Sequence, residues 1–333
     1  MSFSNINGPK SLLSVKSYQA LEPKRPWALQ QIHTNQTDFP ESACIHRLFE
    51  QQVQETPQSI AINFDNTQVT YQQLNRQSNR LAYQLSTLGI EPGHSVGICV
   101  EPSLDMVIGL LGILKAGGVY VPITPNVPRK HVTHIFQDTQ PKVLLTQTYL
   151  EHNLEAFLSH QDINLICLDR DQWKNMQSCP DLGVHVTANS LGYIIYPNSS
   201  TDQSNIAMMS HNTICNQLYW RQHIFPLNKT DSVLQDVSFD FVPSVWQIFW
   251  PLLSGAQVIL PHSHLYQDLD YLVNLITQAG VSAIDLPLDL LRDLLEHPQL
   301  ENSKTLQQIF CGDEPLPLDL KQKFLQQFTT PSV

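Results

Sequence analysis

Apolar residues along this chain alternate between two spacings. Short stretches such as 119–123 are apolar throughout, which is typical of strands buried on both faces of a parallel sheet. Between them, apolar residues recur at helical spacing, as at Leu74, Leu81, Leu85 and Leu88. Strands are predicted at 60–64, 67–71, 95–100, 119–123, 142–146, 163–168, 191–196, 232–237, 256–260, 281–286 and 306–311. Helices are predicted at 41–55, 70–89, 104–116, 128–139, 148–159, from about 212, and at 244–254, 267–279, 289–296 and 317–328. This alternation predicts an α/β fold with parallel-rich sheets.

Local signals mark the ends of several elements. The pair Asp65-Asn66 lies between two short apolar stretches, which predicts a hairpin turn. Thr70 precedes a predicted helix and Gln73 follows three positions later, which is the pattern of a capping box. Gly89 is expected to end that helix, because glycine readily adopts the left-handed conformation that closes a helix.

The chain divides into a short and a long part. Residues 1–40 lack periodicity and are rich in Ser, Asn, Gln and Pro, so they are predicted to be a tail or linker. Residues 41–333 are predicted to form one large lobe of two α/β subdomains, with a boundary near residues 185–190.

Composition narrows the function classes. The chain has 333 residues and a formal net charge of −11, and its adjacent basic residues form no more than pairs such as Lys24-Arg25. Nucleic-acid binding needs a clustered basic face, so no nucleic-acid partner is expected. The apolar stretch 106–114 is too short to cross a membrane, and the N-terminus has no signal-peptide pattern. We therefore expect a cytoplasmic protein without a membrane partner.

Cysteines and histidines give no sign of a metal site. The six cysteines are scattered without a C-x-x-C pair, and buried thiols in a reducing compartment are expected. His131 and His134 are three positions apart on a predicted helix, with no third ligand nearby in the sequence. No metal site is predicted.

The stretch 191–211 carries the candidate chemistry. An apolar strand is followed by the small polar loop 198–202, and a second apolar stretch leads to His211 before a helix. A loop of small hydroxyl residues after a strand can wrap a phosphate with backbone N–H groups. This loop has no glycine, lysine or arginine. An ordinary polar surface loop is therefore the alternative interpretation.

Three segments resemble the signatures of a known family. Residues 69–75 (VTYQQLN) resemble the signature T-Y-x-E-L, and residues 114–123 (LKAGGVYVPI) resemble L-K-A-G-x-A-Y-V-P-I-D, with Thr124 in place of the closing Asp. Residues 35–40 with 44–50 resemble the linker between a condensation and an adenylation domain. The chain is thus similar to the N-terminal lobe of adenylate-forming (AMP-binding) enzymes, in the branch of amino-acid adenylation domains of nonribosomal peptide synthetases.

The resemblance implies a two-step reaction. ATP and a carboxylic acid would give an acyl-adenylate and pyrophosphate, and the acyl group would then pass to a thiol on a carrier domain. ATP and Mg²⁺ are therefore the implied cofactors. Other synthetase modules or a carrier protein are the implied partners.

The family's phosphate loop, Y-T-S-G-S/T-T-G-x-P-K-G-V, aligns without gaps with residues 196–207. Its glycines correspond to Ser199, Asp202 and Ile206, and its lysine to Asn205. The hydroxyl pair is kept as Ser200 and Thr201. A carboxylate such as Asp202 would repel a phosphate 4 Å away by about 4 kcal/mol at an effective dielectric near 20. Ser199, Ser200 and Thr201 are predicted to be a degenerate nucleotide site.

The family's substrate-binding signature, F-D-x-S-V-W-E, aligns with Phe-Val-Pro-Ser-Val-Trp-Gln beginning at Phe241. The alignment puts Val242 where the family's Asp holds the substrate amine. Phe241, Val242 and Trp246 form the predicted substrate pocket. An unpaired buried ammonium is costly, so an acid without an amine is favoured. Asp240 could supply the carboxylate only if two residues bulged before Ser244. The alternative is that the aromatic residues only pack the core.

Residues 309–317 resemble V-x-G-G-E-A-L-P, the turn that lies against the adenine in the family. Gly312, Asp313 and Glu314 are the residues that the resemblance assigns to it. The family's next signature, N-x-Y-G-P-T-E, its ribose-binding Asp and its small C-terminal domain do not follow in these 333 residues. We therefore expect a truncated large lobe.

Two hypotheses about function follow. In the first, the chain is an adenylation-domain-like protein of a nonribosomal peptide (secondary metabolite) pathway that is a pseudoenzyme on its own, with no catalytic residue assigned. In the second, it is a partial acyl- or aminoacyl-adenylate-forming ligase that another chain completes by supplying the missing C-terminal part.

Overall fold

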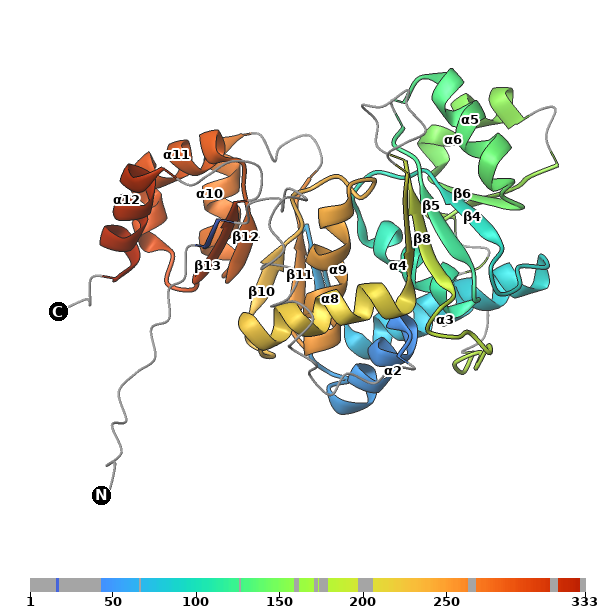
Figure 1. Ribbon diagram of the computed structural model, residues 1–333, viewed down its shortest axis with the longest axis horizontal. Coiled ribbons are helices and arrows are strands. Elements are labelled where there is room, and N and C mark those ends of the chain that lie inside the picture. The colour runs from blue at the N-terminus through green and yellow to red at the C-terminus, as the bar shows by residue number, and fades with distance from the viewer. Residues whose placement is uncertain are drawn as a thin grey trace, which may run out of the picture. The chain divides into compact units, whose positions relative to one another are not determined.

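A computed structural model gives the structure of two compact units. It describes residues 16–17, 43–65, 67–125, 127–158, 162–170, 173, 179–196, 206–262, 268–311 and 317–329. The large unit is Asn35–Tyr266, and the small unit is Met1–Thr34 with Gln267–Val333. Both units combine strands with helices (Figure 1).

A six-stranded sheet lies in the large unit, in the order β7-β6-β4-β5-β8-β9. Its strands are β4 (Ser95–Ile98), β5 (Val119–Pro122), β6 (Val143–Thr146), β7 (Asn164–Cys167), β8 (Leu191–Ile195) and β9 (Ala207–Ser210). Its helices are α4 (Leu104–Lys115), α5 (Arg129–Thr139) and α6 (Thr148–Leu158). The strands pair in parallel except β8 and β9, which are antiparallel. Strands β5 and β6 are buried at every position, as their unbroken apolar sequences predict.

Four further strands of the large unit run in the order β10-β11-β2-β3. They are β10 (Ser232–Leu234), β11 (Gln257–Leu260), β2 (Ile60–Phe64) and β3 (Thr67–Thr70), with helices α2 (Ile45–Glu55), α3 (Tyr71–Thr87), α8 (His211–Ile224) and α9 (Val242–Ser254). Strands β2 and β3 are antiparallel and Asp65 has a φ of 48°, so the predicted hairpin is confirmed. Helix α9 packs on β10 and β11, and α2 packs on α9 (Figure 1).

Helices α3 and α4 pack closely in the large unit. Thr70 Oγ1 accepts a hydrogen bond from the Gln73 backbone N–H (3.2 Å), and Gln73 Oε1 accepts one from the Thr70 N–H (2.9 Å), which confirms the predicted capping box. Where the helices meet, a Cβ atom on Gly112 would lie 2.7 Å from Leu81 Cδ2. Only glycine therefore allows this approach without a shift of Leu81.

The small unit contains three strands that pair in parallel, in the order β1-β13-β12. They are β1 (Lys16–Ser17), β13 (Gln308–Cys311) and β12 (Ala283–Asp285), with helices α10 (Leu269–Gln278), α11 (Leu288–Glu296) and α12 (Leu318–Thr329) and the 3₁₀ helix Pro298–Asn302. Asp268 caps α10, because its Oδ1 accepts a hydrogen bond from the Tyr271 N–H (3.1 Å).

The structure confirms the predicted α/β architecture with parallel-rich sheets, and it adds β1, β9 and the 3₁₀ helix. The apolar stretch of β9 forms a strand because it pairs with β8. The sequence did not predict this pairing, because no two-residue turn signal connects the two stretches. The boundary near residues 185–190 and the linker role of residues 1–40 stay predictions. Across the described residues, no helix combines the length and apolar character needed to cross a bilayer.

Candidate functional site

The carboxyl ends of β4, β5 and β8 lie at one edge of the six-stranded sheet, because these strands run parallel. Ligands of open α/β sheets bind at such an edge. The hairpin register pairs Ile195 with Ala207, so both ends of the connecting loop are placed there. The predicted nucleotide residues Ser199, Ser200 and Thr201 belong to 197–205, which lie outside the described residues.

Tyr196 fixes the point where the chain leaves β8 for this loop. Its side chain is buried, and its hydroxyl donates a hydrogen bond to Asp138 Oδ2 (3.5 Å). The ring of His134 lies edge-on to the Tyr196 ring, with 6.3 Å between centroids, and His134 Nε2 is 3.6 Å from the same Asp138 oxygen. Burial, together with the Asp138 carboxylate, raises the pKa of Tyr196 to about 12. Tyr196 is therefore a neutral hydrogen-bond donor at neutral pH.

The segment between β10 and α9 is held by the buried amide of Gln247. Its Oε1 accepts a hydrogen bond from the Val237 N–H (3.2 Å), and its Nε2 donates one to Asp236 Oδ1 (2.5 Å). Ser244 Oγ also donates to the Phe239 carbonyl oxygen (3.1 Å). An amide can brace the segment in both directions, because it is donor and acceptor at once.

Asp240 is bound by other side chains at the same edge. It is only 3% exposed, its Oδ1 accepts a hydrogen bond from Ser238 Oγ, and Thr124 Oγ1 lies 3.5 Å from its Oδ2. Thr124 follows β5, so this contact joins the carboxyl ends of the two sets of strands. Helix α9 begins at Val242 with Phe241 as its N-cap, so Asp240 precedes the helix.

The predicted substrate pocket begins at the first turn of α9. Phe241 is 54% exposed and Val242 is 39% exposed. One turn later, Trp246 lies against α8, where the guanidinium carbon of Arg221 is 3.9 Å from the centre of its ring. The ring of Trp250 completes this stack, 5.8 Å from Trp246. The structure thus puts Phe241 and Val242 at the exposed start of the helix, and Trp246 in a cation–π stack. The pocket stays a prediction.

The residues predicted to lie against an adenine belong to the small unit. Strand β13 ends at Cys311. Gly312, Asp313 and Glu314 follow it directly and lie outside the described residues, so their assignment stays a prediction.

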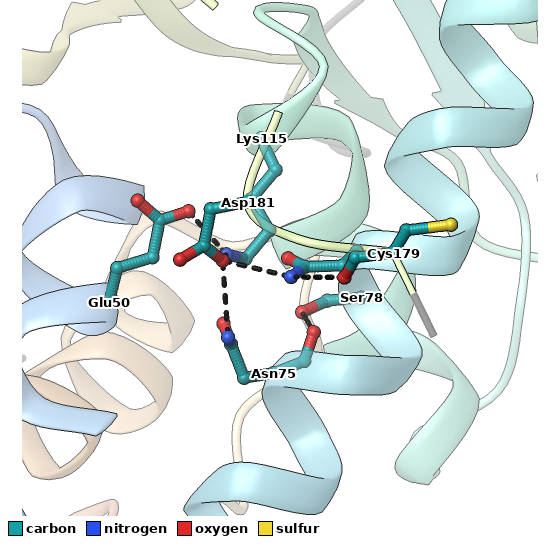
Figure 2. A network of polar contacts seen from close by, with 7 residues as sticks. Glu50, Asn75, Ser78, Lys115, Cys179 and Asp181 are labelled. Carbon is teal, nitrogen blue, oxygen red and sulfur yellow. Dashed lines mark hydrogen bonds and ion pairs between the residues drawn. The ribbon is translucent and has the colours of Figure 1, made fainter. Parts of the chain in front are cut away.

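Sequence reasoning missed a buried polar network around Lys115 (Figure 2). The Lys115 side chain is 1% exposed, and its ammonium forms ion pairs with Glu50 and with Asp181 Oδ1, the latter at 3.2 Å. Asp181 Oδ1 also accepts hydrogen bonds from Nδ2 of Asn75 (3.1 Å) and of Asn79 (2.9 Å). A single lysine at the end of an apolar helix was the only sequence signal for this network.

The network lies away from the candidate site. Lys115 ends α4 just before β5 starts, which is the edge opposite the carboxyl ends of the strands. Burial raises the pKa of Glu50, and the nearby ammonium only partly opposes this. Burial would also raise the pKa of Asp181, but Lys115 and the hydrogen bonds from Asn79 and Asn75 outweigh it and lower the pKa.

A second buried group joins the starts of α2 and α8. The rings of His46 and His211 meet edge-on, with centroids 5.5 Å apart, and the Ile45 N–H donates a hydrogen bond to His211 Nδ1 (3.4 Å). Burial lowers the pKa of His46 to about 3 and that of His211 to about 4, so both rings are neutral at pH 7. Within the described ranges, no group of three His, Cys, Asp or Glu side chains is placed to hold a metal ion.

The loop of the candidate site offers no cation to a triphosphate. Residues 197–205 contain one carboxylate, Asp202, and no lysine or arginine. Near the end of β5, Asp240 adds a buried carboxylate beside Thr124. Phosphate sites need cations or converging N–H groups, because the charge must be offset where water is excluded.

Known proteins resemble this chain along most of its length. Residues 49–333 match the family described as AMP-binding enzyme. Tyrocidine synthase 3 of Brevibacillus parabrevis is 33% identical over 287 residues, which are 86% of this chain and 4% of that protein. Zwittermicin A synthase ZmaJ of Bacillus cereus is 32% identical over 279 residues, which are 83% of this chain and 52% of that protein. The chain thus spans about half the length of one relative and a small fraction of the other.

Solved structures show the same fold. A crystal structure of the nonribosomal peptide synthetase FmoA3 in an AMPPNP-bound form superposes with a TM-score of 0.78 at 24% identity, over 90% of this chain and 32% of that one. At this identity the likeness establishes the fold alone. The match to the family model covers more than half of the chain, and by it the chain belongs to the AMP-binding enzyme family.

Proposed function

We propose that this chain is an adenylation-domain-like part of a nonribosomal peptide pathway and does not activate a carboxylic acid with ATP by itself. The observation that carries the proposal is the charge of the loop between β8 and β9. Its two ends lie at the edge formed by the carboxyl ends of the parallel strands, yet residues 197–205 bring a carboxylate and no cation. A repulsion of about 4 kcal/mol corresponds to roughly a thousandfold loss of nucleotide affinity.

The start of α9 supports the same proposal. Val242 has no group that could pair with an ammonium, and Asp240 already engages Ser238 and Thr124. If an acid is bound at this end of α9, it is one without an α-amine, because an unpaired ammonium in a partly buried site is costly. Partner synthetase modules or a carrier protein belong to this proposal through the relatives, which are synthetases.

Exchange of labelled pyrophosphate into ATP tests the proposal. The purified chain is assayed with a panel of amino, hydroxy, keto and aryl acids, beside an adenylation enzyme as positive control. No exchange above the protein-free blank is expected with any acid. Acid-dependent exchange by this chain alone would overturn the proposal.

The second hypothesis, a ligase completed by another chain, gives a different result in the same assay. A polypeptide carrying the C-terminal part of an adenylation domain is added to this chain. Exchange that needs both polypeptides and one particular acid would favour completion in trans. Under our proposal the mixture stays inactive, because the loop charge is unchanged by the addition.

A further inference from the structure

Helices α2, α8 and α9 lie together in the large unit (Figure 1). A pocket of about 260 Å³ is lined by residues of all three helices. Its apolar wall includes Leu48 from α2, Leu218 from α8 and Trp250 from α9. Leu218 and Trp250 are otherwise buried, so the wall is continuous with the core. Three segments distant in sequence thus form one concave site, at the far end of α9 from the predicted substrate pocket.

The amide of Gln222 holds one side of this pocket in place. Its Oε1 accepts hydrogen bonds from Trp250 Nε1 (2.7 Å) and Ser254 Oγ (2.9 Å), while its Nε2 donates to the carbonyl of Leu227 (2.8 Å). These bonds fix the positions of the aromatic ring and the helix end. The pocket is therefore preformed, and a guest would not have to order it.

The electrostatics of the pocket favour a cation. Glu55 and Ser254 both line it, and they are the last residues of α2 and α9, so two helix C-termini meet there. Each terminus carries about half a negative charge. Neither helix has a basic residue in its last turn, and Glu55 is the only charged residue among the described lining. Arg221 of α8 is held over Trp246 and is not part of the lining.

We propose that this three-helix pocket is a docking site for a partner polypeptide that inserts one arginine side chain. The aliphatic stem would pack on Leu218 and Trp250, and the guanidinium would reach Glu55 and the carbonyl groups of the helix ends. The volume is below the ~300–1,000 Å³ of sites that bury a whole free ligand, so it suits one side chain anchored by its chain. The net charge of −11 favours a basic partner surface.

Arginine fits better than lysine here. A guanidinium stacks on aromatic rings and donates in several directions at once, as two helix ends and a carboxylate require. A lysine ammonium is a strongly hydrated point charge that gives up more water on entry. The proposal concerns a different face of the fold from the candidate site, and it stands whether or not the chain activates an acid.

The test compares two peptides on the full chain. The probes are acetyl-Ala-Leu-Arg-Leu-Ala-amide and the same peptide with citrulline, the neutral isostere, in place of arginine. Binding is followed by NMR of methyl-labelled leucines, with Leu48, Leu218 and Leu253 as reporters. The arginine peptide is expected to shift these signals with about tenfold higher affinity. Equal affinities, no binding of either peptide, or shifts confined to other methyl groups would overturn the proposal.

A charge variant with a matched control sharpens the test. Glu55→Gln is expected to lower the affinity for the arginine peptide about three- to fivefold and to leave the affinity for the citrulline peptide unchanged. Glu91→Gln, also exposed but outside the pocket, is expected to change neither. Identical effects of the two variants would contradict the role of Glu55. Free N-acetyl-arginine-methylamide binding as tightly as the peptide would contradict docking of a polypeptide.

Discussion

The ammonium nitrogen of Lys115 lies 3.2 Å from Oδ1 of Asp181, a residue 66 positions later in the chain. Glu50 provides a second carboxylate on the same ammonium. The contact connects α2, α3 and α4 to the segment that precedes β8. Two carboxylates against one buried cation leave a net negative group, which the amides of Asn75 and Asn79 help to stabilise.

Replacing Lys115 tests how much stability this network supplies. Lys115→Met keeps the apolar stem but leaves two carboxylates without their cation, so unfolding should become easier by about 3–5 kcal/mol. Urea unfolding followed by circular dichroism measures the change. Lys229→Met, at an exposed position, is the control and should change stability by less than about 0.5 kcal/mol. Equal losses in both variants would contradict the structural role of the network.

Stability should fall in mild acid because of His46 and His211. Their folded pKa values are lowered from 6.5 to about 3 and about 4, so below pH 6.5 the unfolded chain binds protons that the folded chain does not. At pH 5, each ring should lower the free energy of unfolding by about 2 kcal/mol. This cost grows as the pH falls further, until the pH nears the folded pKa.

Unfolding measured between pH 7.5 and 4.5 checks this. Between pH 7 and pH 5, the free energy of unfolding of His211→Asn should fall by about 2 kcal/mol less than that of the unmodified chain. This difference does not depend on how the substitution changes stability at pH 7. His223→Asn, at an exposed position of the same helix, should leave the slope unchanged. An unaltered slope in the His211 variant would show that another group titrates.

Tyr71 should stabilise the junction between α3 and the end of α9 through its hydroxyl. The hydroxyl lies 2.6 Å from the Ala256 carbonyl oxygen and 3.1 Å from that of Pro251, in a fully buried position. Tyr71→Phe removes only the hydroxyl group. The free energy of unfolding, measured by thermal unfolding, is therefore expected to fall by about 1–3 kcal/mol. Tyr83→Phe on the same helix, where the ring is 45% exposed, should be nearly neutral.

Reversing the loop charge should improve nucleotide binding. Asp202→Gly with Asn205→Lys removes a carboxylate and adds a cation, so titration calorimetry with AMPPNP should show at least about a hundredfold gain in affinity. Gln278→Lys with Asp289→Asn makes the same change in net charge at exposed positions of the small unit and is the control. No gain, or an equal gain in both, would mean that the loop does not face a nucleotide.

The sequence by itself determined the class of fold and most of its local structure. Unbroken apolar stretches predicted strands such as β5, because only a strand covered on both faces buries every side chain. The hairpin at Asp65 and the cap at Thr70 were also predictable, since their chemistry acts over a few residues. The family followed from the signature at residues 114–123.

Tertiary structure decided what depends on contacts between distant residues. Nothing in the sequence pairs Lys115 with Asp181, joins His46 to His211, or places Asp240 beside Thr124. The three-helix pocket also exists only because α2, α8 and α9 come together. Sequence spacing reports which face of an element is buried, whereas the partner across that face depends on how the elements pack.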